Sequence, residues 1–139
     1  MSEGAGATFE LAVRVYYEDT DAAGVVYYAN YLRYMERART EWLAALGMEL
    51  SLLEREHRVA FVVHRVDIEY LRPARLGDRL LVGVRPIEHG RSRLVLEQRV
   101  MRNDEPLTRA RVTLACLDPA RWRPARIPGT LLERLDPRA

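Results

Sequence analysis

One segment of the sequence has the periodicity of a long helix, and strand-like alternation surrounds it. Apolar side chains recur at spacings of four and three at Tyr31, Met35, Ala38, Trp42 and Ala45. This spacing places them on one face of a helix. The helix is expected to begin either with Asn30 as its cap or one turn earlier, near Val26, and to stop at Gly47. A single long helix must bury its apolar face on another element, and the rest of the chain supplies strands.

Alternation of apolar and polar residues predicts five strands, one before the helix and four after it. They lie within residues 8–15, 62–70, 80–84, 94–100 and 108–116. Pro73 follows the second strand, and the turns "EHGRS" and "RNDEP" separate the later ones. "SLLE", Ser51 to Glu54, has the spacing of a capping box and predicts a short second helix. The order of one strand, one long helix and four strands indicates an α+β fold with an antiparallel sheet.

The length of 139 residues indicates one domain. One helix covers only part of a five-stranded sheet, so pairing with a second copy of the chain is expected to cover an exposed edge or face. Residues 1–7 read as a loose leader, and the tail from Pro119 holds four of the seven prolines, so it is expected to be extended or frayed.

Composition narrows the possible partners and surroundings. No apolar run approaches the roughly 18 residues of a membrane span, and the first ten residues lack the pattern of a signal peptide, so no membrane insertion is expected. The single Cys116 cannot form an internal disulfide, which favours a cytoplasmic location. All 22 basic residues are arginines, but they are interleaved with acids, so nucleic acid is not an expected partner.

Several chemistries lack their sequence patterns. There is no GxGxxG, P-loop, CxxC or GxSxG motif, and the three histidines do not have the spacing of metal ligands. No metal and no cofactor are therefore expected. His64 and Cys116 lie on apolar faces of predicted strands, which favours a hydrogen-bonded core residue and a buried structural thiol.

The stretch "EDTDAAGVVYYANY", Glu18 to Tyr31, places Asp19 and Asp21 just before the helix. Acidic side chains are stabilised near the positive N-terminal end of a helix, which explains these two residues without any catalytic role. The alternative is a carboxylate aimed at a substrate. The free N–H groups of a helix start can hold an oxyanion while a nearby carboxylate attacks a carbonyl or activates water. This second interpretation suits hydrolysis by acyl transfer.

Longer motifs carry a family resemblance. "VYYEDTDAAGVVYYANYLRYMERARTEWL" (residues 15–43), "YLRPARLGD" (70–78) and "EHGRSRLVLEQRV" (88–100) occur in the order found in the 4-hydroxybenzoyl-CoA thioesterase family. The chain most resembles the branch of small acyl-CoA thioesterases associated with the Tol–Pal system. The resemblance implies one hot-dog domain over residues 8–130, with a long central helix wrapped by a five-stranded antiparallel sheet and flexible termini at 1–7 and 131–139. It also implies homodimers or homotetramers that hydrolyse acyl-CoA without metal, CoA being part of the substrate.

Carried over to this chain, the resemblance assigns the catalytic carboxylate to Asp21. It gives the backbone N–H of Tyr28 the task of polarising the thioester carbonyl, and Gly24 lets the turn approach the substrate. Glu18 and Asp19 are then structural. The Tol–Pal branch has a histidine where this chain has Tyr28, so a histidine-assisted reaction is not implied. Whether Asp21 acts as nucleophile or general base is open.

The remaining assignments concern the rest of the substrate. The turn His89, Gly90, Arg91 and Ser92 resembles the segment of the family that binds the CoA nucleotide, with Arg91 as the phosphate contact and Arg65 and Arg75 as weaker candidates. The alternative is a hairpin turn with a solvated arginine. Tyr27, Tyr28 and Tyr34 are candidates for lining the acyl pocket, whereas Tyr31 is assigned to the core. The expected acyl group is short-to-medium aliphatic or aromatic.

Two other functions stay open at the level of sequence. One is a thioesterase acting on acyl groups carried by acyl carrier protein. The other is a non-enzymatic hot-dog protein that binds an acyl ligand.

Overall fold

The structure, a computed structural model, describes residues 8–135. A curled antiparallel sheet holds one long helix, α1 (Tyr28–Ala45). The strands are β1 (Phe9–Arg14), β2 (Ala60–Tyr70), β3 (Arg79–His89), β4 (Arg93–Arg102), β5 (Glu105–Asp118) and β6 (Arg123–Pro124). The remaining elements are η1 (Tyr17–Asp19), α2 (Leu50–Leu52), η2 (Leu53–His57) and α3 (Gly129–Leu135). The predicted α+β hot-dog fold is confirmed, and the two-residue strand β6 is an addition to the five expected strands.

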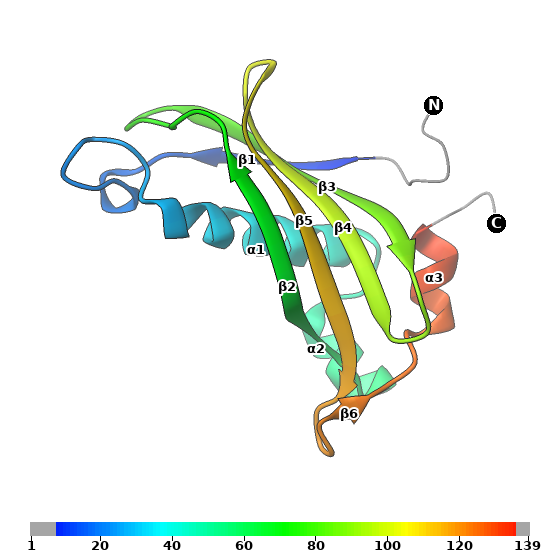
Figure 1. The fold of residues 1–139 in the computed structure, drawn as a ribbon. Coiled ribbons are helices and arrows are strands. Elements are labelled where there is room, and N and C mark those ends of the chain that lie inside the picture. The colour runs from blue at the N-terminus through cyan, green and yellow to red at the C-terminus, as the bar shows by residue number, and fades with distance from the viewer. Residues whose placement is uncertain (1–7, 136–139) are drawn as a thin grey trace.

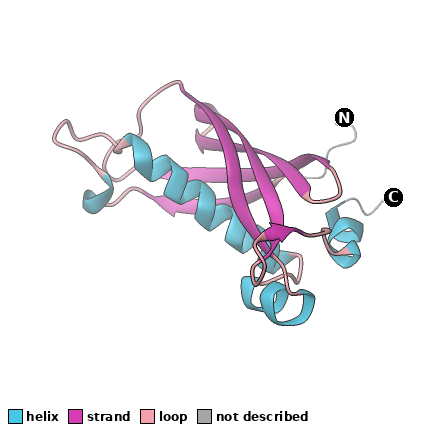
Figure 2. Cartoon of the chain, turned by 60° about the horizontal axis from the view of Figure 1, so that its bottom comes forward, coloured by secondary structure: helices cyan, strands magenta, loops and turns pink. Residues whose placement is uncertain are grey.

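The five long strands follow the order β1-β3-β4-β5-β2, and every pairing is antiparallel. The chain places β1 and β2 at the two edges, although they are the first two strands in sequence, because α1 connects them across the sheet. Figure 1 shows the sheet curving around α1, and Figure 2 shows the helix lying within the curl. The edge strand β2 leaves one row of main-chain groups without a partner within the described chain.

The start of α1 falls between the two positions expected from the sequence. Tyr27 is its N-cap, and no side chain caps it. The expectation that Asn30 caps the helix is wrong, because Asn30 lies in the first turn and its Nδ2 donates to the carbonyl of Asp19 at 2.9 Å. At the other end Gly47 has a φ of 77°, as expected for the residue that stops a helix.

The core lies between α1 and the concave face of the sheet. The helical stripe supplies Tyr31, Met35, Ala38 and Trp42, each at most 4% exposed, whereas its last predicted member, Ala45, is exposed at the end of α1. The inward positions of β5 are all buried, as the alternation predicted: Thr108, Ala110, Val112, Leu114 and Cys116. Burial raises the pKa of the Cys116 thiol to about 11, which confirms its prediction as a buried thiol.

The prediction that His64 is a core residue is wrong, because His64 is exposed. The register between β2 and β5 shifts between Val63 and Arg65, so His64 is the extra residue of a bulge. A bulge reverses the alternation on one side of it. Phe61 and Val66 therefore both pack on the core although they are five residues apart. In a regular strand, residues on one face are separated by an even number of positions.

The tail is extended where β6 adds to the edge of β5, as expected. The expectation of an extended or frayed tail is wrong over residues 129–135, which form α3 and bury Leu131 and Leu135. Arg134 of α3 donates to the carbonyl of Leu46 at 2.6 Å, at the C-terminal end of α1. A helix end has free carbonyls, and a cation there is favourable, so the tail closes this end of the molecule. Residues 1–7 and 136–139, the rest of the predicted flexible termini, lie outside the described residues.

A short helical segment after α1 was predicted and is present as α2 and η2. Its start differs from the prediction, because α2 begins at Leu50 and no side chain caps it. Ser51 is therefore inside the helix, and the predicted capping box is wrong. The segment contributes Leu53 to the core.

Candidate active site

The turn that carries Asp21 is closed by main-chain hydrogen bonds. Thr20 and Val26 form an antiparallel bridge, and the N–H of Asp21 donates to the carbonyl of Val25 at 2.9 Å. Gly24 donates back to the carbonyl of Asp21 at 3.0 Å and has a φ of 80°, a conformation that favours glycine. The turn thus folds back on itself and brings Asp21 next to the residues that lead into α1.

The Asp21 carboxylate is exposed and only partly used by the protein. Its Oδ1 accepts the N–H of Ala23 at 2.9 Å, which fixes the side chain over the turn. Its second oxygen accepts no hydrogen bond from residues 8–135. One carboxylate oxygen is therefore available to a water molecule or a substrate.

The start of α1 offers main-chain donors beside this turn. Among the described residues, the N–H groups of Tyr28 and Ala29 have no hydrogen-bond acceptor, and no acid lies in the first helical turn. Free N–H groups and the positive end of the helix dipole attract a developing negative charge. The structure therefore brings Asp21, Gly24 and the N–H of Tyr28 to one end of α1, as predicted from the sequence.

An aromatic group stands beside these donors. Tyr27 and Tyr28 are about half exposed, and their ring centroids lie 4.9 Å apart. Tyr31 is buried and accepts the N–H of Ala74 at 2.9 Å, so its assignment to the core is confirmed. Tyr34 is 1% exposed and packs in the core too, so it does not line an open pocket.

Sequence reasoning missed Tyr70, the last residue of β2. Its hydroxyl donates to the carbonyl of Tyr28 at 3.2 Å, and its ring meets that of Tyr28 edge to face with the centroids 6.2 Å apart. Tyr70 therefore holds the residue that carries the proposed N–H donor. Its position in the "YLRPAR" segment was the available signal, but only the fold shows that the end of β2 meets the start of α1.

The predicted nucleotide-binding turn lies at the other end of the sheet. His89 ends β3, and Gly90, Arg91 and Ser92 connect it to β4 beside α3, whereas the turn of Asp21 is the blue loop at the left of Figure 1. The ten residues of β4 separate the two ends by about 30 Å. Within one chain the structure does not bring this turn to Asp21, so a shared substrate requires that the turn comes from a second subunit.

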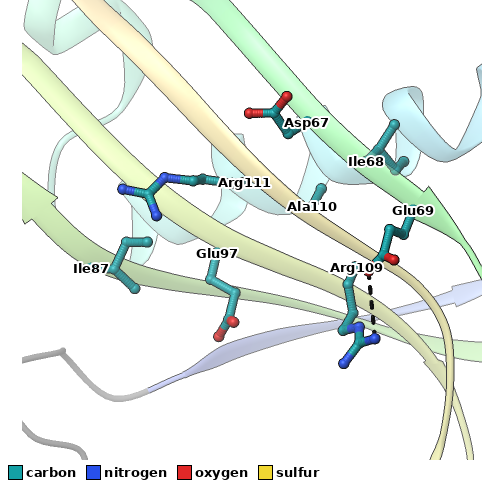
Figure 3. Close-up of a pocket in the computed structure, with 8 residues that line it drawn as sticks. All are labelled: Asp67, Ile68, Glu69, Ile87, Glu97, Arg109, Ala110 and Arg111. Carbon is teal, nitrogen blue, oxygen red and sulfur yellow. Dashed lines mark hydrogen bonds and ion pairs between the residues drawn. The ribbon is translucent and has the colours of Figure 1, made fainter.

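The outer face of the sheet, away from α1, carries a hollow of about 390 Å³ (Figure 3). Charged side chains surround it, and two of them, Arg109 and Glu69, form an ion pair at 3.5 Å. Its lining residues are Asp67, Ile68, Glu69, Ile87, Glu97, Arg109, Ala110 and Arg111. Neither Asp21 nor Tyr28 lines this hollow, so it is separate from the candidate active site.

Residues 8–135 lack two further features. No group of three or more His, Cys, Asp or Glu side chains in this range is arranged to hold a metal ion. No helix within it has the length and apolar character needed to cross a membrane. A reaction without metal or cofactor stays a prediction.

The fold and the turn before α1 define a class of protein, the hot-dog thioesterases. The family model of the thioesterase-like superfamily matches residues 15–135. The acyl-CoA thioesterase YbgC of Haemophilus influenzae is 45% identical over 120 residues, which are 86% of this chain and 88% of that protein. The chain belongs to the thioesterase-like superfamily and, within it, to the 4-hydroxybenzoyl-CoA thioesterase family. It is a thioester hydrolase.

Two other similar proteins have different names. A 1,4-dihydroxy-2-naphthoyl-CoA hydrolase of Synechococcus elongatus is 35% identical over 111 residues, which are 79% of this chain and 80% of that protein. A solved thioesterase of Thermus thermophilus, complexed with coenzyme A and Zn, is 37% identical with a TM-score of 0.77. The match covers 91% of this chain and 90% of that one.

Proposed function

We propose that the chain hydrolyses acyl-CoA thioesters, with Asp21 as the catalytic carboxylate and the N–H of Tyr28 as the group that polarises the carbonyl. The observation that carries this proposal is a carboxylate with one free oxygen next to a helix start with free N–H donors. The relatives named as hydrolases of acyl-CoA and of an aromatic acyl-CoA support the substrate class.

In the proposed reaction the oxygen of water forms a bond with the carbonyl carbon and the carbon–sulfur bond breaks. As a general base, Asp21 takes a proton from the attacking water and returns it to the departing thiolate. As a nucleophile, its oxygen attacks first and displaces the CoA thiolate, which takes a proton from solvent, and water then cleaves the mixed anhydride to release the acid and regenerate Asp21. In both cases the N–H of Tyr28 holds the negative charge that develops on the carbonyl oxygen. Gly24 allows the turn its left-handed conformation and leaves the approach to Asp21 free of a side chain.

The acyl group is proposed to be short-to-medium aliphatic or aromatic, because exposed aromatic rings surround the helix start. A panel of acyl-CoA esters, followed by release of free thiol, tests this proposal. Cys116 will contribute little signal, because it is buried and its raised pKa keeps it protonated. We expect turnover of short-to-medium and aromatic esters to exceed that of long-chain esters. Faster turnover of long-chain esters would contradict the proposed acyl class.

The same panel separates the alternative functions. The rate of hydrolysis is compared for the same acyl group carried by CoA and by acyl carrier protein, and the CoA ester is expected to react faster. A preference for the protein carrier would favour the acyl carrier protein thioesterase. Binding of acyl-CoA without thiol release would instead indicate a ligand-binding protein. The predicted cytoplasmic location is tested separately by cell fractionation.

A second copy of the chain is proposed to complete the site. The edge strand β2 can pair with β2 of a partner around a two-fold axis, which makes the pairing antiparallel. The start of β2 lies toward the β3–β4 turn and its end at Tyr70 lies beside Tyr28. Antiparallel pairing therefore brings the β3–β4 turn of the partner toward the end of this chain that carries Asp21. Two such dimers could form a homotetramer, as the family resemblance implied.

Arg91 is then proposed to contact CoA phosphate across the subunit interface. Its side chain is exposed, and its carbonyl accepts the N–H of Ile127 at 2.8 Å, which anchors the turn. We expect Arg91→Ala to raise KM about tenfold, the loss of one charge-assisted contact, with kcat nearly unchanged. Steady-state kinetics with one acyl-CoA ester measures this. Arg93→Ala is the matched control, because Arg93 is already paired with Glu88 at 3.2 Å.

Mixed dimers test whether Arg91 acts across the interface. Subunits with Asp21→Asn are combined with subunits that carry Arg91→Ala. If the site is shared, each mixed dimer has one intact site, built from Asp21 of one subunit and the partner's Arg91. The mixture should then regain a population of sites with the wild-type KM. Sites with only the raised KM would contradict a contact from the partner subunit.

A further inference from the structure

Asp19 is a buried acid for which the proposed reaction has no use. It is 8% exposed, and it forms no ion pair with residues 8–135. A buried carboxylate without a cation costs free energy unless hydrogen bonds stabilise it. Its contacts therefore indicate what the acid does for the protein.

The carboxylate of Asp19 closes the turn η1. Its Oδ2 accepts the N–H of Tyr16 at 2.9 Å, and the N–H of Asp19 donates back to the carbonyl of Tyr16 at 3.0 Å. These two reciprocal bonds fix the conformation of Asp19 and hence the direction of its own carbonyl. The hydroxyl of Tyr34 is buried and has no hydrogen-bond partner among the described residues, and burial together with the charge of Asp19 raises the pKa of Tyr34.

The carbonyl of Asp19 in turn holds the start of α1. It accepts the N–H of Tyr27 and the Nδ2 of Asn30, both at 2.9 Å. Asp19 therefore joins the segment before the Asp21 turn to the helix after it. The intervening residues 20–27 form a loop that is pinned at both ends through this one residue. Asp21 is two residues from Asp19, and Tyr28 directly follows Tyr27.

We propose that Asp19 is a positioning residue that fixes the Asp21 carboxylate relative to the N–H of Tyr28. This inference rests on the proposed function, because it assigns the two groups that Asp19 aligns. Catalysis depends steeply on such alignment, since a misplacement of about 1 Å can lower a rate about 10²-fold. Asp19 itself is buried and does not touch the substrate.

Asp19→Ala removes the acceptor for Tyr16 and frees the direction of the Asp19 carbonyl. We expect kcat per folded subunit to fall about 30-fold while KM changes less than about threefold, because the proposed phosphate contact of CoA, Arg91, lies outside this loop. Asp19→Asn keeps an oxygen for the N–H of Tyr16 and should retain kcat within about threefold of wild type. Glu18→Ala is the matched control, because Glu18 is the exposed neighbour and makes no hydrogen bond with residues 8–135.

The outcomes separate this inference from the proposed function. If wild-type protein does not hydrolyse any acyl-CoA ester, the proposed function fails. If wild type is active and folded Asp19→Ala has the same kcat, the positioning role is wrong. If kcat falls as much in Asp19→Asn as in Asp19→Ala, the charge of Asp19 matters and not its geometry, which also contradicts the positioning role. Should Asp19→Ala not fold, Asn30→Ala removes one bond to the Asp19 carbonyl, and an unchanged kcat in that variant would overturn the inference.

Discussion

Asp21→Asn is expected to lower kcat about 10²- to 10⁴-fold, the usual contribution of a positioned general base. Asparagine has the same shape, and its amide oxygen can still accept the N–H of Ala23 that Asp21 accepts at 2.9 Å. The turn should therefore keep its geometry, while the charge that activates water or attacks the carbonyl is lost. We expect KM for acyl-CoA and the melting temperature to stay close to wild type.

Asp118→Asn is the matched control for this prediction. Asp118 makes the same kind of turn, because its Oδ1 accepts the N–H of Ala120 at 2.9 Å, but it lies at the end of β5 away from α1. Both variants remove one carboxylate from one turn, and only Asp21→Asn should lower kcat. Full activity in Asp21→Asn would remove Asp21 from the reaction.

Gln98→Ala is expected to cost about 3 kcal/mol of folding free energy, the sum of a cavity and unsatisfied polar groups. Gln98 is a fully buried polar side chain on the concave face of β4. Its Nε2 donates to the carbonyl of Met35 at 3.0 Å, and its Oε1 accepts Nη1 of Arg39 at 2.9 Å. Burial lowers the pKa of Arg39, so this guanidinium needs its acceptor. Thermal unfolding should show a loss of roughly 10 °C for a domain of this size.

Arg99→Ala is the comparison for Gln98→Ala. Arg99 is the next residue of β4, points to the outer face, and pairs with Glu97 at 3.4 Å on the surface. A surface ion pair contributes about 0–1 kcal/mol, so its loss should be barely measurable. Protein concentration is kept equal, because unfolding of the proposed dimer would depend on concentration. Equal melting temperatures for the two variants would show that the Gln98 contacts do not stabilise the fold.

Much of the fold could be predicted from periodicity. The helical stripe from Tyr31 to Trp42 is buried, and the alternation of residues 108–116 matches the inward face of β5. Both patterns extend over enough residues to determine which side chains face the core. The tail could not be predicted in this way, because its prolines suggested an extended segment and the helix α3 depends on packing of Leu131 against the core.

The errors share a physical cause. His64 was placed in the core by an alternation that a bulge in β2 reverses, and no side chain in the sequence marks that bulge. Asn30 has the side chain of a helix cap, but the carbonyl of Asp19 offers it a different partner. Bulges and tertiary hydrogen bonds depend on residues that are distant in sequence.

The candidate site also has one part that the local sequence predicts and another that only the fold brings together. The Asp21 turn and the helix start are adjacent in sequence, so a local motif was enough to place them together. Tyr70 lies 42 residues after Tyr28, and only the folded sheet brings its hydroxyl to that helix start. The nucleotide turn around Arg91 is distant from Asp21 in one chain, and its predicted role therefore depends on assembly.

A crystal structure with a CoA thioester analogue that cannot be hydrolysed tests the central claim most directly. We expect an oxygen of Asp21, or one water molecule bound to it, to lie within about 3.5 Å of the carbonyl carbon. The N–H of Tyr28 should lie about 3 Å from the carbonyl oxygen. A bound analogue whose carbonyl carbon lies beyond reach of Asp21 and its bound water, with the carbonyl oxygen turned away from the start of α1, would contradict the proposed site.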